Sequence, residues 1–218
     1  MIDFQALLWL FGYLRKEWNL GICFYSDVPK SPTHQLAVKY GFDKLDIWVF
    51  TDASWQDCPD TGHSTTGYYI FFQGGLVDQN SQVQIPVAMS TTESEYMGSC
   101  SGCMAGAHTH MMLYDFLYLG TPDYDTVQEK LPNPPTVIMC DNQAAVQMAK
   151  NDQMTKRNRH IARRFHFVRQ GQKLGLHILK YIKGEDQISD ITTKTQSVSK
   201  ELPHRNRVMF LLPPFMKP

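Results

Sequence analysis

The 218-residue sequence lacks the features that would assign a chain to several large classes of protein. Its formal net charge is zero, so no whole-molecule field attracts it to nucleic acid, and any basic binding surface must be local. No apolar run approaches the roughly 18 residues of a membrane span. The N-terminus has no basic leader and no small-residue cleavage site. We therefore expect neither a signal peptide nor a membrane partner.

The cysteines indicate neither a disulfide framework nor a metal site. The five cysteines are odd in number and scattered, which argues against a disulfide framework and favours a reducing, cytoplasmic compartment. Cys100 and Cys103, followed by His108 and His110, do not have the spacing of a common zinc module. They fall in an apolar stripe at helical spacing, so we interpret them as core residues.

The overall composition is that of a globular protein. Hydrophobic residues make up 43% and charged residues 19%, which suits one domain with appendages. Residues 1–44 read as an N-terminal extension with an amphipathic helix over 4–18 and a proline-containing linker over 29–34. The core domain spans 45–196, and a C-terminal tail spans 197–218.

The core domain alternates strand and helix patterns. This alternation predicts an α/β fold in which a mixed five-stranded sheet is flanked by helices. Strands are expected up to residue 52 and over 65–72, 76–89, 135–140 and 174–182, with a long helix over 91–119 and shorter helices at 144–149 and after 186.

Four carboxylates occur where these strands end or these helices begin. More than forty residues separate each from the next, so a shared site requires four elements to converge. Phosphodiester hydrolysis gives a reason for this, because two divalent ions about 3.5–4 Å apart activate water and stabilise the charge of the transition state. Mg²⁺ prefers oxygen ligands, which carboxylates provide. The candidate catalytic and metal-binding residues are Asp52, Glu95, Asp141 and Asp190.

Two of these assignments have competitors nearby. Ser90 and Glu93 match a capping box at the start of the long helix, which leaves Glu95 to face the sheet. A box that starts at Thr92 would instead make Glu95 the capping partner, so the residues alone leave both readings open.

The last acid has a rival as well. Asp186 competes with Asp190, and we expect Asp186 to be the N-cap of the closing helix. Asp190 would then lie one turn further in, between Ile188 and Ile191, on a face that can turn inward.

Together, four motifs resemble the ribonuclease H domain of copia-type LTR retrotransposon polyproteins: Phe50-Thr51-Asp52-Ala53-Ser54, Ser90-Thr91-Thr92-Glu93-Ser94-Glu95-Tyr96, Met139-Cys140-Asp141-Asn142-Gln143 and Gln187-Ile188-Ser189-Asp190-Ile191. The resemblance also favours Glu95 over Glu93. It implies a ribonuclease H-like fold and an endonuclease that hydrolyses the RNA strand of RNA–DNA hybrids during reverse transcription, leaving a 3′-hydroxyl and a 5′-phosphate.

The resemblance further implies the cofactors and partners. Two Mg²⁺ ions are expected, with Mn²⁺ as a substitute. The partners would be the RNA–DNA hybrid and the reverse transcriptase part of the same polyprotein, which residues 1–44 would join, inside the virus-like particle of the parent element.

Hybrid recognition needs donors for the 2′-hydroxyl and cations for the phosphates. The run 156–169 has six fixed cations and no acid, and we expect Phe165 and Val168 in it to pack inward. Cellular ribonucleases H have a histidine in the loop before their last acid, whereas the loop 183–187 has none here, and Glu185 is the candidate replacement. The candidate nucleic-acid contacts are Thr91, Thr92, Asn142, Gln143, Arg159, Arg163 and Arg164.

Two other functions compete with this one. An integrase or transposase shares the fold class but resembles a pattern with glutamate about 35 residues after the second aspartate, where this chain has Leu176. A ribonuclease H-like module without activity could tether nucleic acid or partner domains. The presence of all four acids argues against this alternative.

Overall fold

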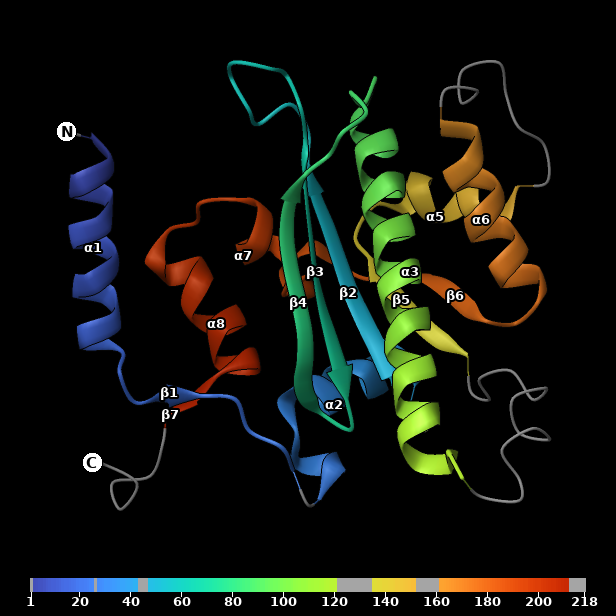
Figure 1. Cartoon of the computed structure of the whole chain (residues 1–218), viewed down its shortest axis with the longest axis horizontal. Helices are drawn as coiled ribbons and strands as arrows, with labels where there is room; N and C mark the ends of the chain where they lie inside the picture. The colour runs from blue at the N-terminus through green and yellow to red at the C-terminus, as the bar shows by residue number, and fades with distance from the viewer. Residues whose placement is uncertain (1, 26, 43–46, 121–134, 152–160, 212–218) are drawn as a thin grey trace.

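In the computed structural model (Figure 1), which describes residues 2–25, 27–42, 47–120, 135–151 and 161–211, the central feature is a five-stranded sheet. Its order is β4-β3-β2-β5-β6, with β2–β3 and β3–β4 antiparallel and β2–β5 and β5–β6 parallel. The predicted mixed five-stranded sheet with flanking helices is confirmed. The strands are β2 Ile47–Ser54, β3 Thr65–Phe72, β4 Gly75–Val83, β5 Thr136–Cys140 and β6 His177–Tyr181.

The middle strand, β2, is buried along its whole length. Successive side chains of a strand point to opposite faces, and β2 divides its residues accordingly. Ile47 and Val49 belong to the hydrophobic cluster on one face, while Trp48 and Phe50 belong to the cluster on the other. Both faces of the sheet must therefore be covered by other elements.

On the first face lie α3 Thr91–Tyr118, α5 Gln143–Lys150 and α6 Ala162–Lys173 (Figure 1). The long helix α3 approaches β2 closely because Gly102 has no side chain there; a Cβ at this position would overlap the Thr51 side chain. Cys100 and Cys103 are each 1% exposed in this core, in agreement with their interpretation as core residues. The apolar stripe of α3 leaves the core further along, where Met111 is 64% exposed.

On the second face lie α2 Pro32–Lys39, α7 Asp190–Thr193 and α8 Val198–Val208. The expectation of a linker over 29–34 is wrong. The 3-10 turn Val28–Lys30 runs into α2, whose N-cap Ser31 accepts a hydrogen bond from the His34 amide. Pro32 occupies the first helical turn, where its missing N–H costs nothing, so this proline starts a helix instead of preventing one.

The segment that follows α1 Ile2–Lys16 pairs with the segment that follows α8 (Figure 1). The short strand β1 Leu20–Gly21 pairs antiparallel with β7 Phe210–Leu211, and Glu17 forms an ion pair with Arg205 of α8 at 3.4 Å. Helix α1 lies at the edge of the molecule (Figure 1), where the Trp9 residue is 75% exposed. Among the residues that the structure describes, no helix combines the length and the hydropathy needed to span a bilayer.

Both flanking segments also contribute to the core. Leu36 and Ala37 of α2 and Val208 of α8 belong to the same buried cluster as Trp48 and Phe50 of the sheet. The division of the chain at residues 45 and 197 stays a prediction. Within the described residues, the packing joins all three parts across that division.

Candidate metal-binding active site

Asp52 lies inside β2, with only 1% of its surface exposed. Its register partner on β3 is Gly67. A Cβ at Gly67 would overlap the side chains of Thr192 and Thr193, so the glycine allows α7 to pack against the sheet at this point. This close packing places the short helix α7 directly over Asp52.

Two more acids reach the same place from other elements. Asp141 follows β5, which runs parallel to β2. The two acids therefore lie at the same end of the sheet, near the carboxyl ends of these strands. Asp190 is the first residue of α7. One carboxylate oxygen each from Asp52, Asp141 and Asp190 lie within 4.8 Å of one another. The structure therefore brings these three predicted residues together, while their catalytic role stays a prediction.

The fourth acid, Glu95, lies in the second turn of α3 and is 7% exposed. Ligand atoms of Glu95, Cys140 and Asp141 form a second group within 4.8 Å, so Asp141 belongs to both groups. Glu93 instead accepts a hydrogen bond from the Met89 amide at 2.8 Å. That bond closes the capping arrangement and leaves Glu95 as the acid at the site.

The start of α3 shows why the capping reading with Ser90 is correct. The Ser90 hydroxyl accepts a hydrogen bond from the Glu93 amide at 3.3 Å, which satisfies one of the free N–H groups of the first turn. The expected box is present, except that Glu93 reaches the Met89 amide instead of the amide of Ser90 itself.

Asp186 has a different task from the one expected of it, because it caps no helix. It ends the 3-10 turn Gly184–Asp186 and accepts hydrogen bonds from Lys39 Nζ at 2.5 Å and Tyr40 Oη at 2.7 Å. Arg207 Nη2 lies 3.6 Å from Asp186 Oδ1, the other carboxylate oxygen. These partners come from α2, the residue after it and α8, so no pattern local to residue 186 could have revealed them.

Two residues that the sequence reasoning missed, Thr193 and Lys194, complete the surroundings of the acids. Thr193 Oγ1 donates a hydrogen bond to Asp52 Oδ2. Lys194 Nζ lies 3.1 Å from Asp52 Oδ1 and 3.0 Å from Asp190 Oδ1, so its ammonium group bridges two of the acids. The i, i+4 spacing of Asp190 and Lys194 was the available sequence signal, since such pairs face each other on a helix.

The electrostatics of the cluster disfavour its fully charged form. Burial, followed by repulsion from Asp52, raises the pKa of Asp141 to about 6. Burial, followed by repulsion from Asp52 and Asp141, raises the pKa of Glu95 well above its usual value. The pKa of Asp52 is also raised, chiefly by burial and despite the Lys194 ammonium. Acids whose charges repel in a buried place are stabilised by a bound cation.

The side chains present fit hard divalent cations. Asp52, Asp141, Asp190 and Glu95 offer carboxylate oxygens, which Mg²⁺-like ions prefer. Cys140 is the exception in the second group, but burial raises the pKa of its thiol well above the usual value. A protonated thiol is a poor ligand. The cluster can therefore hold a divalent metal through its oxygens alone.

The predicted nucleic-acid contacts near the start of α3 and after β5 are Thr91, Thr92, Asn142 and Gln143. Thr91 and Gln143 are exposed, Thr92 is half-buried, and Asn142 uses its Oδ1 to cap α5 by accepting from the Ala145 amide at 3.0 Å. The Asn142 amide group keeps its Nδ2 donor for a ligand.

The basic run is described only from residue 161 onward, so Arg159 lies outside the described residues. On α6, Arg163 is exposed and Arg164 is half-buried. Phe165 and Val168 are both fully buried, as expected.

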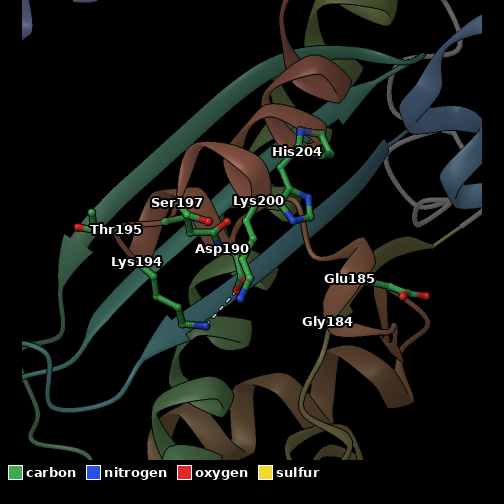
Figure 2. Close-up of a pocket in the computed structure, with 10 residues that line it drawn as sticks. Gly184, Glu185, Asp190, Lys194, Thr195, Ser197, Lys200 and His204 are labelled. Atoms are coloured by element: carbon green, nitrogen blue, oxygen red, sulfur yellow. Dashed lines mark hydrogen bonds and ion pairs between the residues drawn. The ribbon is translucent and has the colours of Figure 1, made fainter.

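A hollow of about 800 Å³ adjoins Asp190, and Figure 2 shows Lys194 beside Asp190 at its wall. Glu185, the predicted replacement for the missing loop histidine, also lines this hollow. A histidine that the sequence reasoning did not consider, His204 of α8, lines it too and is 7% exposed. Its pKa is lowered, mainly by burial.

The chain is similar in sequence to parts of known polyproteins. No protein-family model matches the chain. It is 28% identical over 191 residues to the retrovirus-related Pol polyprotein from transposon TNT 1-94 of Nicotiana tabacum, covering 87% of this chain and 12% of the relative. It is 30% identical over 167 residues to the Pol polyprotein from transposon RE2 of Arabidopsis thaliana, covering 77% of this chain and 11% of the relative. Its homologues are retrovirus-related Pol polyproteins of copia-type plant transposons.

The chain spans about a tenth of the length of those relatives. Among solved structures, it is similar to LC11-RNase H1 isolated from compost, with a TM-score of 0.46 and 13% identity, covering 68% of this chain and 94% of that chain. LC11-RNase H1 has also been solved in complex with an RNA/DNA hybrid.

Proposed function

We propose that this chain is a metal-dependent endoribonuclease that hydrolyses the RNA strand of RNA–DNA hybrids during retrotransposon reverse transcription. The observation that carries the proposal is the gathering of Asp52, Asp141 and Asp190 within 4.8 Å, with Glu95 beside Asp141. Homology to Pol polyproteins supports it, because reverse transcription by such an element produces RNA–DNA hybrids whose RNA must be removed.

The proposed chemistry assigns a task to each acid. Asp141 belongs to both groups of ligand atoms, so it would contact two ion positions, with Asp52 and Asp190 at one and Glu95 at the other. Two Mg²⁺ ions bound there, or Mn²⁺ in their place, would activate the attacking water and stabilise the charge that develops on the phosphate.

In the reaction itself, water adds to the phosphorus, the P–O3′ bond breaks and the 3′-oxygen takes up a proton. The products are a 3′-hydroxyl and a 5′-phosphate. Asp52 and Asp141 are held rigidly for this task because they extend from buried strands at the centre of the sheet, and rigid ligands reduce the reorganisation that the reaction requires.

Hybrid binding would use the surface around the same end of the sheet. Thr91, Gln143 and the Asn142 amide are placed beside Glu95 and Asp141 in the chain, where a hydroxyl or amide can reach the 2′-hydroxyl of the RNA strand. Arg163, Arg164 and Arg159 would contact phosphates. We further propose that the reverse transcriptase part of the same polyprotein is the covalent partner of this segment.

The proposal is tested on a labelled RNA–DNA hybrid with Mg²⁺, comparing the protein with its Asp52→Asn variant. The substitution removes the negative charge and replaces one carboxylate oxygen with an NH₂ group. We therefore expect the cleavage rate to fall about a thousandfold or more, since several kcal/mol of charge stabilisation are lost. Asp60→Asn, the same change at an exposed residue eight positions on, is the matched control and should cleave normally.

Other outcomes would assign the chain elsewhere. Binding of the hybrid without cleavage by the unaltered protein would identify a tethering module. Strand transfer into duplex DNA would identify an integrase-like activity.

A further inference from the structure

The acid cluster already contains a cation of the chain's own. Lys194 Nζ lies 3.1 Å from Asp52 Oδ1 and 3.0 Å from Asp190 Oδ1, which are two of the three acids whose oxygens gather within 4.8 Å. The side chain of Asp52 is completely buried. An uncompensated carboxylate in such a place is strongly unfavourable, so the ammonium group supplies the compensation that a metal ion would otherwise give.

The position of Lys194 is incompatible with a divalent ion between the same two acids. Lys194 Nζ already contacts one oxygen of each carboxylate, so a divalent ion bound by both acids would lie a few ångströms from the ammonium group. Like charges at that distance in a partly buried place repel strongly. Metal binding at Asp52 and Asp190 therefore requires the ammonium group to leave.

The surroundings of Lys194 allow it to leave. Its side chain is 43% exposed and has four flexible methylene groups, unlike the completely buried Asp52 side chain that it contacts. Lys194 also lines the hollow of about 800 Å³ next to the cluster, together with Thr195, Ser197 and Lys200 (Figure 2). Rotation about the side-chain bonds of Lys194 would carry its ammonium group into this hollow.

We propose that Lys194 is an exchangeable counter-ion of the acid cluster: it stabilises the cluster before metal binds and is displaced into the adjoining hollow when divalent ions enter. Lys194 therefore lowers the affinity of the site for metal while it stabilises the metal-free fold. This inference rests on the proposed function, because it assigns the metal to the same four acids.

The test measures binding and stability, independently of cleavage. Mn²⁺ affinity is measured by titration calorimetry, and thermal unfolding is followed in EDTA, for the unaltered protein, Lys194→Met and Lys194→Arg. Lys194→Met should unfold at a lower temperature in EDTA. It should also bind Mn²⁺ at least about tenfold more tightly, which is a typical coupling between two competing ligands. Lys194→Arg keeps the charge and should resemble the unaltered protein in both measurements.

Lys30→Met is the matched control. Lys30 also pairs with an aspartate, Asp27 at 2.8 Å, but it does so on the surface with 77% of its side chain exposed. Its removal should change neither the unfolding temperature nor the Mn²⁺ affinity.

The outcomes separate this inference from the proposed function. Equal or weaker Mn²⁺ binding by Lys194→Met would overturn the exchange and leave the metal-dependent nuclease standing. Failure of Mn²⁺ to bind either protein would overturn both proposals.

A second measurement needs no variant, in case Lys194→Met does not fold. Lysine acylation of the unaltered protein is mapped by mass spectrometry in EDTA and in saturating Mn²⁺, with Lys30 as the internal reference. An ammonium group held between two carboxylates is protected, so we expect the modification of Lys194 to increase several-fold with Mn²⁺. Unchanged modification of Lys194 in a protein that binds Mn²⁺ would show that the ammonium group stays in place.

Discussion

Asp186 and Asp190 are four residues apart in one short segment, yet their surroundings are opposite. Asp186 is 3% exposed and meets Lys39, Tyr40 and Arg207. Burial alone would raise its pKa, but the hydrogen bonds from Lys39 and Tyr40 and the two positive charges lower it. Its charge is therefore compensated by residues of the chain.

Asp190 instead joins a group in which acids face acids. Burial and mutual repulsion raise the pKa values of Asp52, Glu95 and Asp141, although the Lys194 ammonium is close. Asp186 therefore belongs to a structural ion network, whereas the cluster around Asp190 has more negative than positive charge. Perturbed acids gathered in this manner are typical of functional sites.

Asp186→Ala should produce the largest change in stability. It leaves Lys39, Tyr40 and Arg207 without their shared partner, and the free energy of unfolding should fall by about 2 kcal/mol, as for other buried partners left unpaired. Because the pKa of Asp186 is lowered in the folded state, this contribution is present above the unfolded pKa and is lost as the pH falls through the lowered one.

Urea denaturation at pH 7 measures this change, with Glu185→Ala at the exposed neighbouring position as the control. A loss no larger than that of Glu185→Ala would contradict the structural role of Asp186.

Asp141→Asn should have a smaller effect of the opposite sign in the metal-free protein. Since the pKa of Asp141 is raised to about 6, the folded state binds more protons than the unfolded state between about pH 4 and 6. The stability of the unaltered protein should therefore fall as the pH rises through this window. The variant should lose the contribution of Asp141 to that slope and be more stable at pH 7 in EDTA.

Thermal unfolding in EDTA at several pH values checks this prediction. Divalent ions should stabilise the unaltered protein above pH 6 and have less effect on the variant, which lacks one charged ligand. A variant that is less stable than the unaltered protein at pH 7 in EDTA would mean that Asp141 is compensated in the way Asp186 is.

The smallest effect is expected just before Asp186 in the chain, at the pair formed by Lys183 and Glu185. Their charged atoms are 3.8 Å apart and their side chains are 66% and 68% exposed, so solvent screens their attraction. A double-mutant cycle with Lys183→Ala and Glu185→Ala should give a coupling energy below about 0.5 kcal/mol. A coupling above 1 kcal/mol would show that this loop is held more rigidly than its exposure indicates.

Much of the fold and of the site could be predicted because the signals were local. Strand β3 has the predicted bounds of 65–72, since alternating and β-branched residues mark it directly. Asp52, Glu95, Asp141 and Asp190 lie in short motifs at the ends of elements, and these motifs carried the resemblance. The start of α3 was readable from Ser90 and Glu93 for the same reason.

The parts that could not be predicted depend on contacts between distant residues. The expectation of a linker over 29–34 is wrong because Pro32 opens a helix whose Leu36 and Ala37 are buried by the second face of the sheet. Lys194 carries no signal of its own that it reaches Asp52, which is 142 positions away in the chain.

The sequence by itself determined the succession of the five sheet strands and the long helix along the chain, and which acids were available to bind metal, because both follow from local patterns of side chains. Only the tertiary structure decided how those acids differ. Packing of α7 against Gly67 turns Asp190 toward Asp52, while α2 and α8 deliver Lys39 and Arg207 to Asp186. The charge balance of a buried acid depends on which neighbours the fold brings within a few ångströms, and that is a property of the packed chain.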